Sequence, residues 1–140
     1  MAVHLSRRVD FSMLDSAGIA YFPRIFDLSH SFFEECWEIM CNVPYHEMIN
    51  VRRIGFPVAN VESNFVAPIR YGDTVQATVW MEKVGTKSCI WAYRFHNQNG
   101  DLLWSSSQVT VCVNMDSLES QPIPEDLKKG LLLHMGEPPQ

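Results

Sequence analysis

The chain has 140 residues, of which 46% are hydrophobic and 19% charged, a composition typical of one folded domain and unlike that of a disordered or fibrous chain. Eleven basic and sixteen acidic residues give a net charge of −5, which argues against a general binder of nucleic acid or of an anionic membrane surface. Apolar runs stay well short of the roughly 20 residues that span a membrane. The N-terminal residues contain no apolar segment of the kind that a secretion signal has, so we expect a cytoplasmic protein.

The first elements predicted along the chain are a short strand, a loop and a long helix. Residues 3–11 are compatible with a strand, and residues 12–18 are small and turn-forming. From Phe22 to Cys41, apolar side chains recur every three or four residues, which predicts an amphipathic helix. Pro23 fits its first turn, because the missing N–H breaks no helical hydrogen bond there. Such a helix is about 30 Å long, and we expect a curved sheet to wrap it.

The rest of the chain predicts that sheet. Alternating apolar and polar side chains predict strands at 58–69, 74–84, 87–96 and 102–115. Tyr71-Gly72-Asp73 and Asn99-Gly100-Asp101 are read as tight turns between strands, and a short helix is predicted at about 124–134. We therefore expect a single α+β domain over residues 1–140, with one helix against an antiparallel sheet whose consecutive strands are joined by tight turns.

The cysteines give no sign of a metal centre or of a redox site. They show neither a CxxC pair nor a Cys/His spacing typical of zinc. Each lies in an apolar stretch, so we expect free, buried thiols and no metal. The four positions are Cys36, Cys41, Cys89 and Cys112.

The loop before the long helix holds the candidate catalytic group. Asp15 lies three residues before Gly18, and the helix is predicted to begin four residues after that glycine. Unpaired N–H groups at a helix N-terminus can stabilise an oxyanion, and a glycine lets a ligand approach the backbone closely. A carboxylate beside such a site can attack a carbonyl or activate a water. The competing interpretation is a turn or capping role, because Asp is common at helix starts.

Residues 15–23, Asp-Ser-Ala-Gly-Ile-Ala-Tyr-Phe-Pro, resemble the Asp-x-Ala-Gly-Ile-x-aromatic-aromatic-Pro signature of the 4-hydroxybenzoyl-CoA thioesterases. These are acyl-CoA hydrolases with the hotdog fold, a long central helix wrapped by a five-stranded antiparallel sheet. The resemblance extends from about residue 9 to residue 115, through Gly55-Phe56-Pro57, the segment 63–66, Tyr71-Gly72-Asp73 and Lys87-Ser88. It implies the same fold for this chain. One such layer leaves a sheet edge and part of a pocket open, so we expect a homodimer or a tetramer of two dimers.

The resemblance also implies roles for individual residues in the loop. Asp15 would be the catalytic carboxylate, acting either as a nucleophile or as the base for water. The backbone N–H of Phe22, helped by Gly18, would polarise the thioester carbonyl. The aromatic pair Tyr21-Phe22 favours the branch of the family that hydrolyses aryl-CoA substrates.

For the substrate, the resemblance implies contacts from two further regions. Lys87 and Ser88 would contact the CoA phosphates; Arg52 and Arg53 are additional candidates, with solvated surface cations as the alternative. His30 stands where relatives carry an acid that recognises the ring hydroxyl, so it either reads a polar acyl group or is an ordinary surface histidine. The substrate-binding residues implied are Tyr21, His30 and Pro57, with Asn60 and Asn64 contributed by the partner chain.

The activity implied is hydrolysis of an aromatic or medium-sized acyl-CoA to the free acid and CoA, with no metal or redox cofactor. Two alternatives remain. One is a thioesterase for aliphatic acyl-CoA or acyl-carrier-protein substrates, and the other is a non-catalytic acyl-CoA-binding protein. The intact motif from Asp15 to Gly18 argues against the second, because binding alone gives little reason to keep it.

Overall fold

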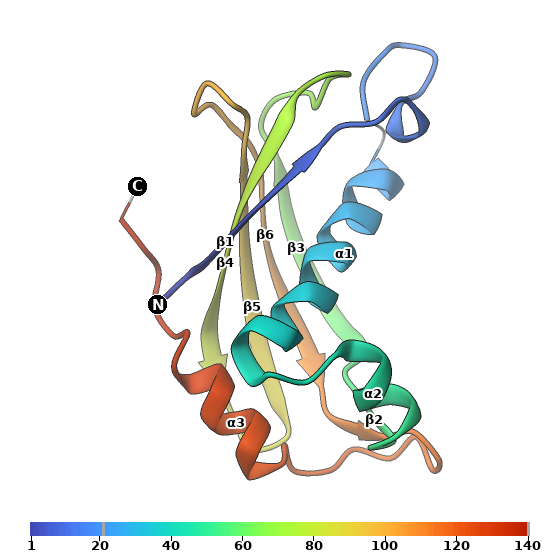
Figure 1. Ribbon diagram of the computed structural model, residues 1–140, viewed down its shortest axis with the longest axis vertical. Helices are drawn as coiled ribbons and strands as arrows, with labels where there is room; N and C mark the ends of the chain where they lie inside the picture. Colours follow the sequence, from blue (N-terminus) through green and yellow to red (C-terminus); the bar gives the residue numbers. More distant parts are fainter. Residues whose placement is uncertain (21, 140) are drawn as a thin grey trace.

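One long helix lies across the concave face of an antiparallel sheet in the computed structural model, which describes residues 1–20 and 22–139 (Figure 1). Its helices are α1 (Phe22–Cys41), α2 (Tyr45–Asn50) and α3 (Glu125–Leu132), with one turn of 3₁₀ helix at Phe11–Met13. Its strands are β1 (Val3–Arg8), β2 (Ile54–Gly55), β3 (Val58–Phe65), β4 (Thr74–Val84), β5 (Ser88–His96), β6 (Leu102–Val111) and β7 (Val113–Asn114).

Helix α1 has the bounds that its periodicity predicts, and its apolar face forms the centre of the core. Trp37 packs against Trp91 of β5 with ring centroids 5.3 Å apart, and Phe33 approaches the same ring at 4.8 Å. All three rings are buried. Full burial of one large apolar side chain contributes about 2 kcal/mol to folding, so these contacts fix the helix on the sheet. The buried residues of α1 are Ile25, Leu28, Ser29, Phe32, Phe33, Cys36, Trp37 and Met40.

The main sheet has five antiparallel strands, as expected for the hotdog fold, in the order β1-β4-β5-β6-β3. Strand β3 pairs with β6 at one edge, whereas β4 lies between β1 and β5. The expected tight connection between β3 and β4 is therefore wrong, because residues 66–73 carry the chain from one edge of the sheet to the other side. Alternation of side chains predicts a strand but does not say which strand lies beside it.

The ends of three predicted strands also differ from the structure. Strand β1 ends at Arg8, and β3 ends at Phe65, before Pro68. The predicted strand 102–115 is divided at Cys112, and β7 pairs with β2 in a separate two-stranded sheet. Helix α2 was not predicted, because six residues are too few for a helical period to stand out.

Helix α3 packs against the C-terminal end of α1 through Gly130. A Cβ added at that glycine would lie 2.6 Å from the backbone oxygen of Met40 and 2.8 Å from the sulfur of Cys41. All four cysteines are free, and Cys36, Cys89 and Cys112 are buried. Burial raises the pKa of Cys36 to about 12, so this thiol stays protonated in the fold.

Within the described part of the chain, no helix is long and apolar enough to cross a membrane.

Candidate active site

The loop that precedes α1 folds into a tight turn around Asp15. The N–H of Asp15 donates to the carbonyl of Ile19 at 3.0 Å, and the N–H of Gly18 donates to the carbonyl of Asp15 at 3.1 Å. Gly18 has a φ of 79°, a left-handed conformation that side chains disfavour. The carboxylate oxygen Oδ1 of Asp15 accepts a hydrogen bond of 2.8 Å from the N–H of Ala17, and the residue is solvent-exposed.

The segment that crosses from β3 to β4 anchors this turn. The N–H of Ala20 donates to the carbonyl of Ile69 at 2.8 Å, and Ile19 forms an isolated β-bridge with Arg70. The Tyr71-Gly72-Asp73 turn follows, in which Asp73 accepts a hydrogen bond from the N–H of Arg70 at 2.9 Å. Residues 66–73, which were predicted to join neighbouring strands, therefore hold the Asp15 turn beside the start of α1.

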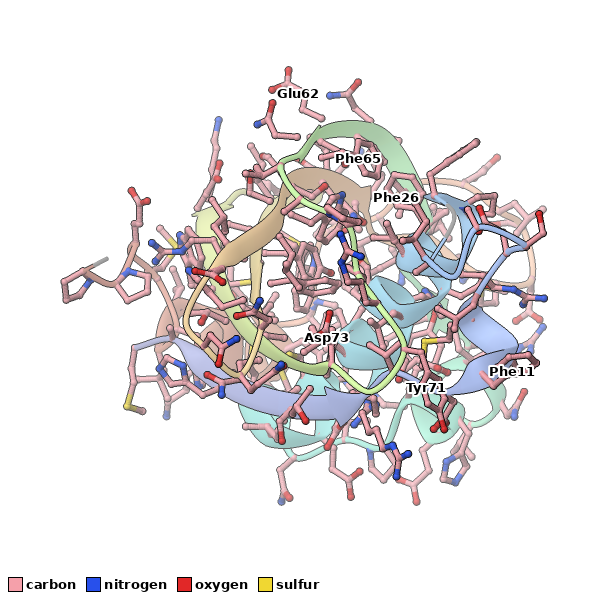
Figure 2. All side chains as sticks on the ribbon, turned by 90° about the horizontal axis from the view of Figure 1, so that it is seen from above. Phe11, Phe26, Glu62, Phe65, Tyr71 and Asp73 are labelled. Atoms are coloured by element: carbon pink, nitrogen blue, oxygen red, sulfur yellow. The ribbon has the colours of Figure 1, made fainter. Side chains whose placement is uncertain are left out.

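Phe22 begins α1, and N–H groups in the first turn of a helix have no partner within that helix. The ring of Phe22 is 64% exposed and meets Phe26 edge-on, with centroids 6.5 Å apart. Figure 2, which looks down onto this end of the molecule, shows Phe26 and Phe65 facing one another; their centroids are 6.3 Å apart. Tyr21, predicted to bind substrate, lies outside the described residues. Asp15 and Phe22 are thus both exposed, and the ring of Phe22 contacts the half-buried ring of Phe26.

An apolar cavity of about 510 Å³ begins at Phe26 and runs along α1 toward α2. Phe33 and Phe56 form much of its wall, and Val58 and Val61 of β3 close one side. An aromatic or other large apolar group fits such a lining. Neither Asp15 nor Phe22 lines this cavity, although Phe22 contacts Phe26, which does.

Two of the predicted substrate-binding residues line the cavity. They are His30 of α1 and Pro57, which directly precedes β3. The exposed imidazole of His30 stacks on Phe33 at a centroid distance of 5.4 Å and meets Tyr45 of α2 edge-on at 6.0 Å. Burial, and next the charge of Glu34, raise the pKa of Tyr45, so its hydroxyl remains a hydrogen-bond donor.

Asn60 and Asn64 lie on the other face of the sheet in this chain. Their register partners in β6 are Val109 and Ser105, which alternate with the buried residues that face α1. The side-chain amide of Asn64 donates to the Ser105 hydroxyl at 3.5 Å. A role for either asparagine in the site of a partner chain stays a prediction.

A buried polar network forms the floor of the cavity. The Nε2 atom of Gln108 in β6 donates to the hydroxyls of Ser29 and Ser106, at 3.3 Å each. Ser106 in turn bonds to Ser63 at 2.9 Å. Burial raises the pKa of Tyr93 well above its usual value, and its interaction with Ser29 opposes that shift.

Sequence reasoning missed Ser29 and Gln108, although a signal was present for each. Ser29 is a polar residue at a position where the helical period puts an apolar one, and it is 1% exposed. Gln108 lies four residues after Trp104 in β6, so the two side chains lie on the same buried face of the sheet. Ser106 is likewise buried.

The residues predicted to contact CoA lie at the opposite end of the sheet from Asp15. Lys87 and Ser88 are at the β4–β5 hairpin, at the bottom of Figure 1, whereas the turn around Asp15 is at the top. Lys87 is exposed, and among residues 1–20 and 22–139 no carboxylate forms an ion pair with it. One chain alone therefore does not bring Lys87 to its own Asp15.

Arg52 and Arg53, the additional candidates for CoA contacts, both form ion pairs with carboxylates. Arg52 makes a bidentate pair with Asp126, at 2.7 and 2.9 Å. Its guanidinium holds the pKa of Asp126 below the usual range. Arg53 pairs with Asp116 at 3.0 Å. Both arginines have a structural role here, whereas contact with CoA stays a prediction.

No cluster of three or more His, Cys, Asp or Glu side chains among the described residues is arranged to hold a metal ion.

Comparison with known proteins gives concordant matches. The family model of the thioesterase-like superfamily matches residues 9–131. A 1,4-dihydroxy-2-naphthoyl-CoA hydrolase of Prochlorococcus marinus (strain NATL2A) is 30% identical over 117 residues, covering 79% of this chain and 74% of the relative. A protein of the same name from Thermosynechococcus vestitus is 22% identical over 121 residues, which cover 86% of this chain and 82% of the relative.

Solved structures share the fold. A thioesterase-superfamily protein from Jannaschia sp. CCS1 superposes with a TM-score of 0.89 at 22% identity, covering 97% of this chain and 94% of that chain. A 1,4-dihydroxy-2-naphthoyl-CoA thioesterase from Synechocystis gives 0.85 at 18% identity, covering 94% and 96%. A mutant 4-hydroxybenzoyl-CoA thioesterase, solved with 4-hydroxybenzoyl-CoA bound, gives 0.84 at 18% identity, covering 93% and 98%.

Proposed function

The chain belongs to the thioesterase-like superfamily, and on that premise we propose that it hydrolyses an aromatic acyl-CoA thioester to the free acid and CoA. One observation carries the proposal: the exposed carboxylate of Asp15 lies on a tight turn just before the N-terminus of α1, and the same helix lines an apolar cavity that begins one turn further along, at Phe26. The names of the relatives support a hydroxylated ring, such as 1,4-dihydroxy-2-naphthoyl or 4-hydroxybenzoyl, as the acyl group.

The proposed chemistry needs a carboxylate, a water and backbone donors. The thioester carbonyl accepts a hydrogen bond from the N–H of Phe22, which stabilises the negative charge that develops on the oxygen. As a base, Asp15 takes a proton from a water, the water oxygen bonds to the carbonyl carbon, and the C–S bond breaks to release CoA as a thiol. As a nucleophile, the Asp15 carboxylate bonds to the carbonyl carbon, and the C–S bond breaks to release the CoA thiolate, which takes a proton from solvent. Water then hydrolyses the mixed anhydride to the free acid and restores the carboxylate. Neither route invokes a metal or a redox cofactor.

The test of this function is the Asp15→Asn variant, assayed with 4-hydroxybenzoyl-CoA and 1,4-dihydroxy-2-naphthoyl-CoA by release of the thiol. We expect kcat to fall by roughly 10²–10⁴-fold, because an amide neither accepts the proton nor attacks the carbonyl. Trapping of an acyl-enzyme in a single turnover would distinguish the nucleophile from the base.

Asp10→Asn is the matched control. Asp10 is an exposed acid five residues before Asp15, at the start of the 3₁₀ turn Phe11–Met13, and its side chain makes no capping hydrogen bond there. It should keep the activity of the native chain. Undiminished hydrolysis by Asp15→Asn would refute the mechanism, and a native chain that cleaves only aliphatic thioesters would refute the aromatic substrate.

We further propose that the site is completed by a second copy of the chain. Strand β3 is an edge strand, and its apolar residues Val58, Val61 and Phe65 are 49%, 41% and 54% exposed. Pairing of β3 with its copy about a two-fold axis, in antiparallel fashion, would cover them and would place the Lys87 end of one chain near Asp15 of the other. A tetramer of two such dimers and a cytoplasmic location stay predictions.

A further inference from the structure

The floor of the cavity contains a polar group that the proposed chemistry does not use. Gln108 is 7% exposed, yet it lines a cavity whose walls are mostly apolar. Burying an amide atom without a hydrogen-bond partner costs folding free energy, so each polar atom of Gln108 needs an identified partner.

The neighbours of Gln108 determine which way its amide points. The Ser106 hydroxyl donates its one proton to the carbonyl of Glu62 at 2.8 Å. Ser106 can therefore only accept from Gln108, which places Nε2, and not Oε1, against it at 3.3 Å. The second hydrogen of Nε2 is taken by Ser29, also at 3.3 Å.

The amide oxygen of Gln108 is left as a pure acceptor. Both amide hydrogens are used, and no donor from residues 1–20 or 22–139 forms a hydrogen bond to Oε1. Ser63 bonds to Ser106, and turning the amide over would break both hydrogen bonds that Nε2 donates to Ser29 and Ser106. An acceptor fixed in this way, in an apolar cavity, selects a ligand that brings a donor.

Position along α1 indicates which part of the substrate reaches Gln108. Ser29 lies seven residues after Phe22, about 10 Å further along the helix axis. A group that contacts the floor while its thioester carbonyl is held at the N–H of Phe22 is therefore a ring substituent remote from the carbonyl.

We propose that Gln108, held by Ser29 and Ser106, determines acyl specificity by accepting a hydrogen bond from a hydroxyl on the distal side of the aromatic ring. The inference rests on the proposed function, to which it adds the side chain that recognises the ring hydroxyl. Oε1 selects a ring substituent that can donate a hydrogen bond, as a hydroxyl does. A methoxy group at the same position can only accept a hydrogen bond and leaves Oε1 unpaired.

The experiment compares kcat/KM for 4-hydroxybenzoyl-CoA, 4-methoxybenzoyl-CoA, benzoyl-CoA and 1,4-dihydroxy-2-naphthoyl-CoA. The native chain should prefer the hydroxylated rings over the other two by roughly tenfold to hundredfold. In Gln108→Met, which keeps the length of the side chain without the acceptor, that preference should fall to within about threefold while benzoyl-CoA is still cleaved. The comparison within the native chain needs no variant and stands even if Gln108→Met folds poorly.

Thr110→Val is the matched control. Thr110 is a buried polar residue on the same face of β6, bonded to Trp91 at 3.0 Å, and it does not line the cavity. Its loss should lower stability and leave the hydroxyl preference unchanged.

Two results would overturn the inference alone. One is equal cleavage of hydroxylated and methoxylated rings by the native chain, and the other is a preference that survives in Gln108→Met and so originates elsewhere, as at His30 or Tyr45. Hydrolysis of aliphatic thioesters with none of the aromatic ones would instead refute the proposed function, and the inference with it.

Discussion

Gly18 determines the shape of the turn that carries Asp15. Its φ of 79° is left-handed, and a Cβ there would meet nothing within 4 Å, so only backbone strain opposes a side chain. We expect Gly18→Ala to cost about 1–2 kcal/mol of unfolding free energy and, because the turn relaxes, to lower kcat at least tenfold. Urea unfolding and steady-state kinetics measure the two effects.

Gly100 provides the control for that prediction. It has a φ of 83° and equally open space, but it lies in the β5–β6 hairpin. Gly100→Ala should lose similar stability and keep its kcat, since it imposes the same strain away from the turn. If the two variants lost kcat equally, the shape of the Asp15 turn would have no special role in hydrolysis.

At the residue scale, the sequence predicted what depends on neighbours in the chain. Asp15, Gly18 and the start of α1 lie within eight residues, and a local motif describes them well. Gln108 and Ser29 lie 79 residues apart, and their contact exists only because β6 passes beneath α1. No local pattern contains that information, so the turn at Asp15 was predictable and the cavity floor was not, while the catalytic role of Asp15 stays a prediction.

At the scale of elements, the contact between α1 and α3 depends on the absence of a side chain at Gly130. A Cβ would lie 2.6 Å from the backbone oxygen of Met40, which cannot move independently of its helix. Gly130→Ala should therefore destabilise the fold by about 1–3 kcal/mol, despite the higher helix propensity of alanine. The midpoint of urea unfolding measures the change.

Lys129→Ala is the comparison, because Lys129 is the exposed neighbour on the same helix. It should change stability by less than about 0.5 kcal/mol. A Gly130→Ala variant as stable as the native chain would show that the two helices can separate at little cost.

Elements were predictable where their period is long and regular. Helix α1 agrees with its predicted bounds because twenty residues repeat one amphipathic pattern. The order of strands was not predictable from alternation, since β3 and β4 are consecutive in the chain yet lie on opposite sides of β5 and β6. The Tyr71-Gly72-Asp73 turn exists in the structure, which is why the segment looked like a hairpin. The turn does not join neighbouring strands; it leads into β4 after the chain has crossed the sheet.

At the scale of the whole molecule, the separation of Asp15 from Lys87 predicts that an active site needs two chains. Neither Asp15→Asn nor Lys87→Ala should support efficient turnover at low substrate concentration. A heterodimer of the two variants would contain one site with both residues intact, and we expect about half the native activity from it. Two different affinity tags allow its purification, and thiol release measures its rate.

A crossed heterodimer provides the control. When one chain is native and the other carries both substitutions, every shared site lacks either Asp15 or Lys87, so activity should be lost. If this crossed form kept half the activity and the first form none, each site would lie within a single chain, contrary to the proposed dimer.

The turn around Asp15 and the floor of the cavity are built from separate parts of the chain. Hydrogen bonds within residues 15–19 close the turn, whereas α1 and β6 supply the floor. A mutation in the floor therefore leaves the carboxylate where it is. If the floor determines acyl preference as we propose, a substitution there changes which acyl group is accepted and leaves the hydrogen bonds of the Asp15 turn untouched.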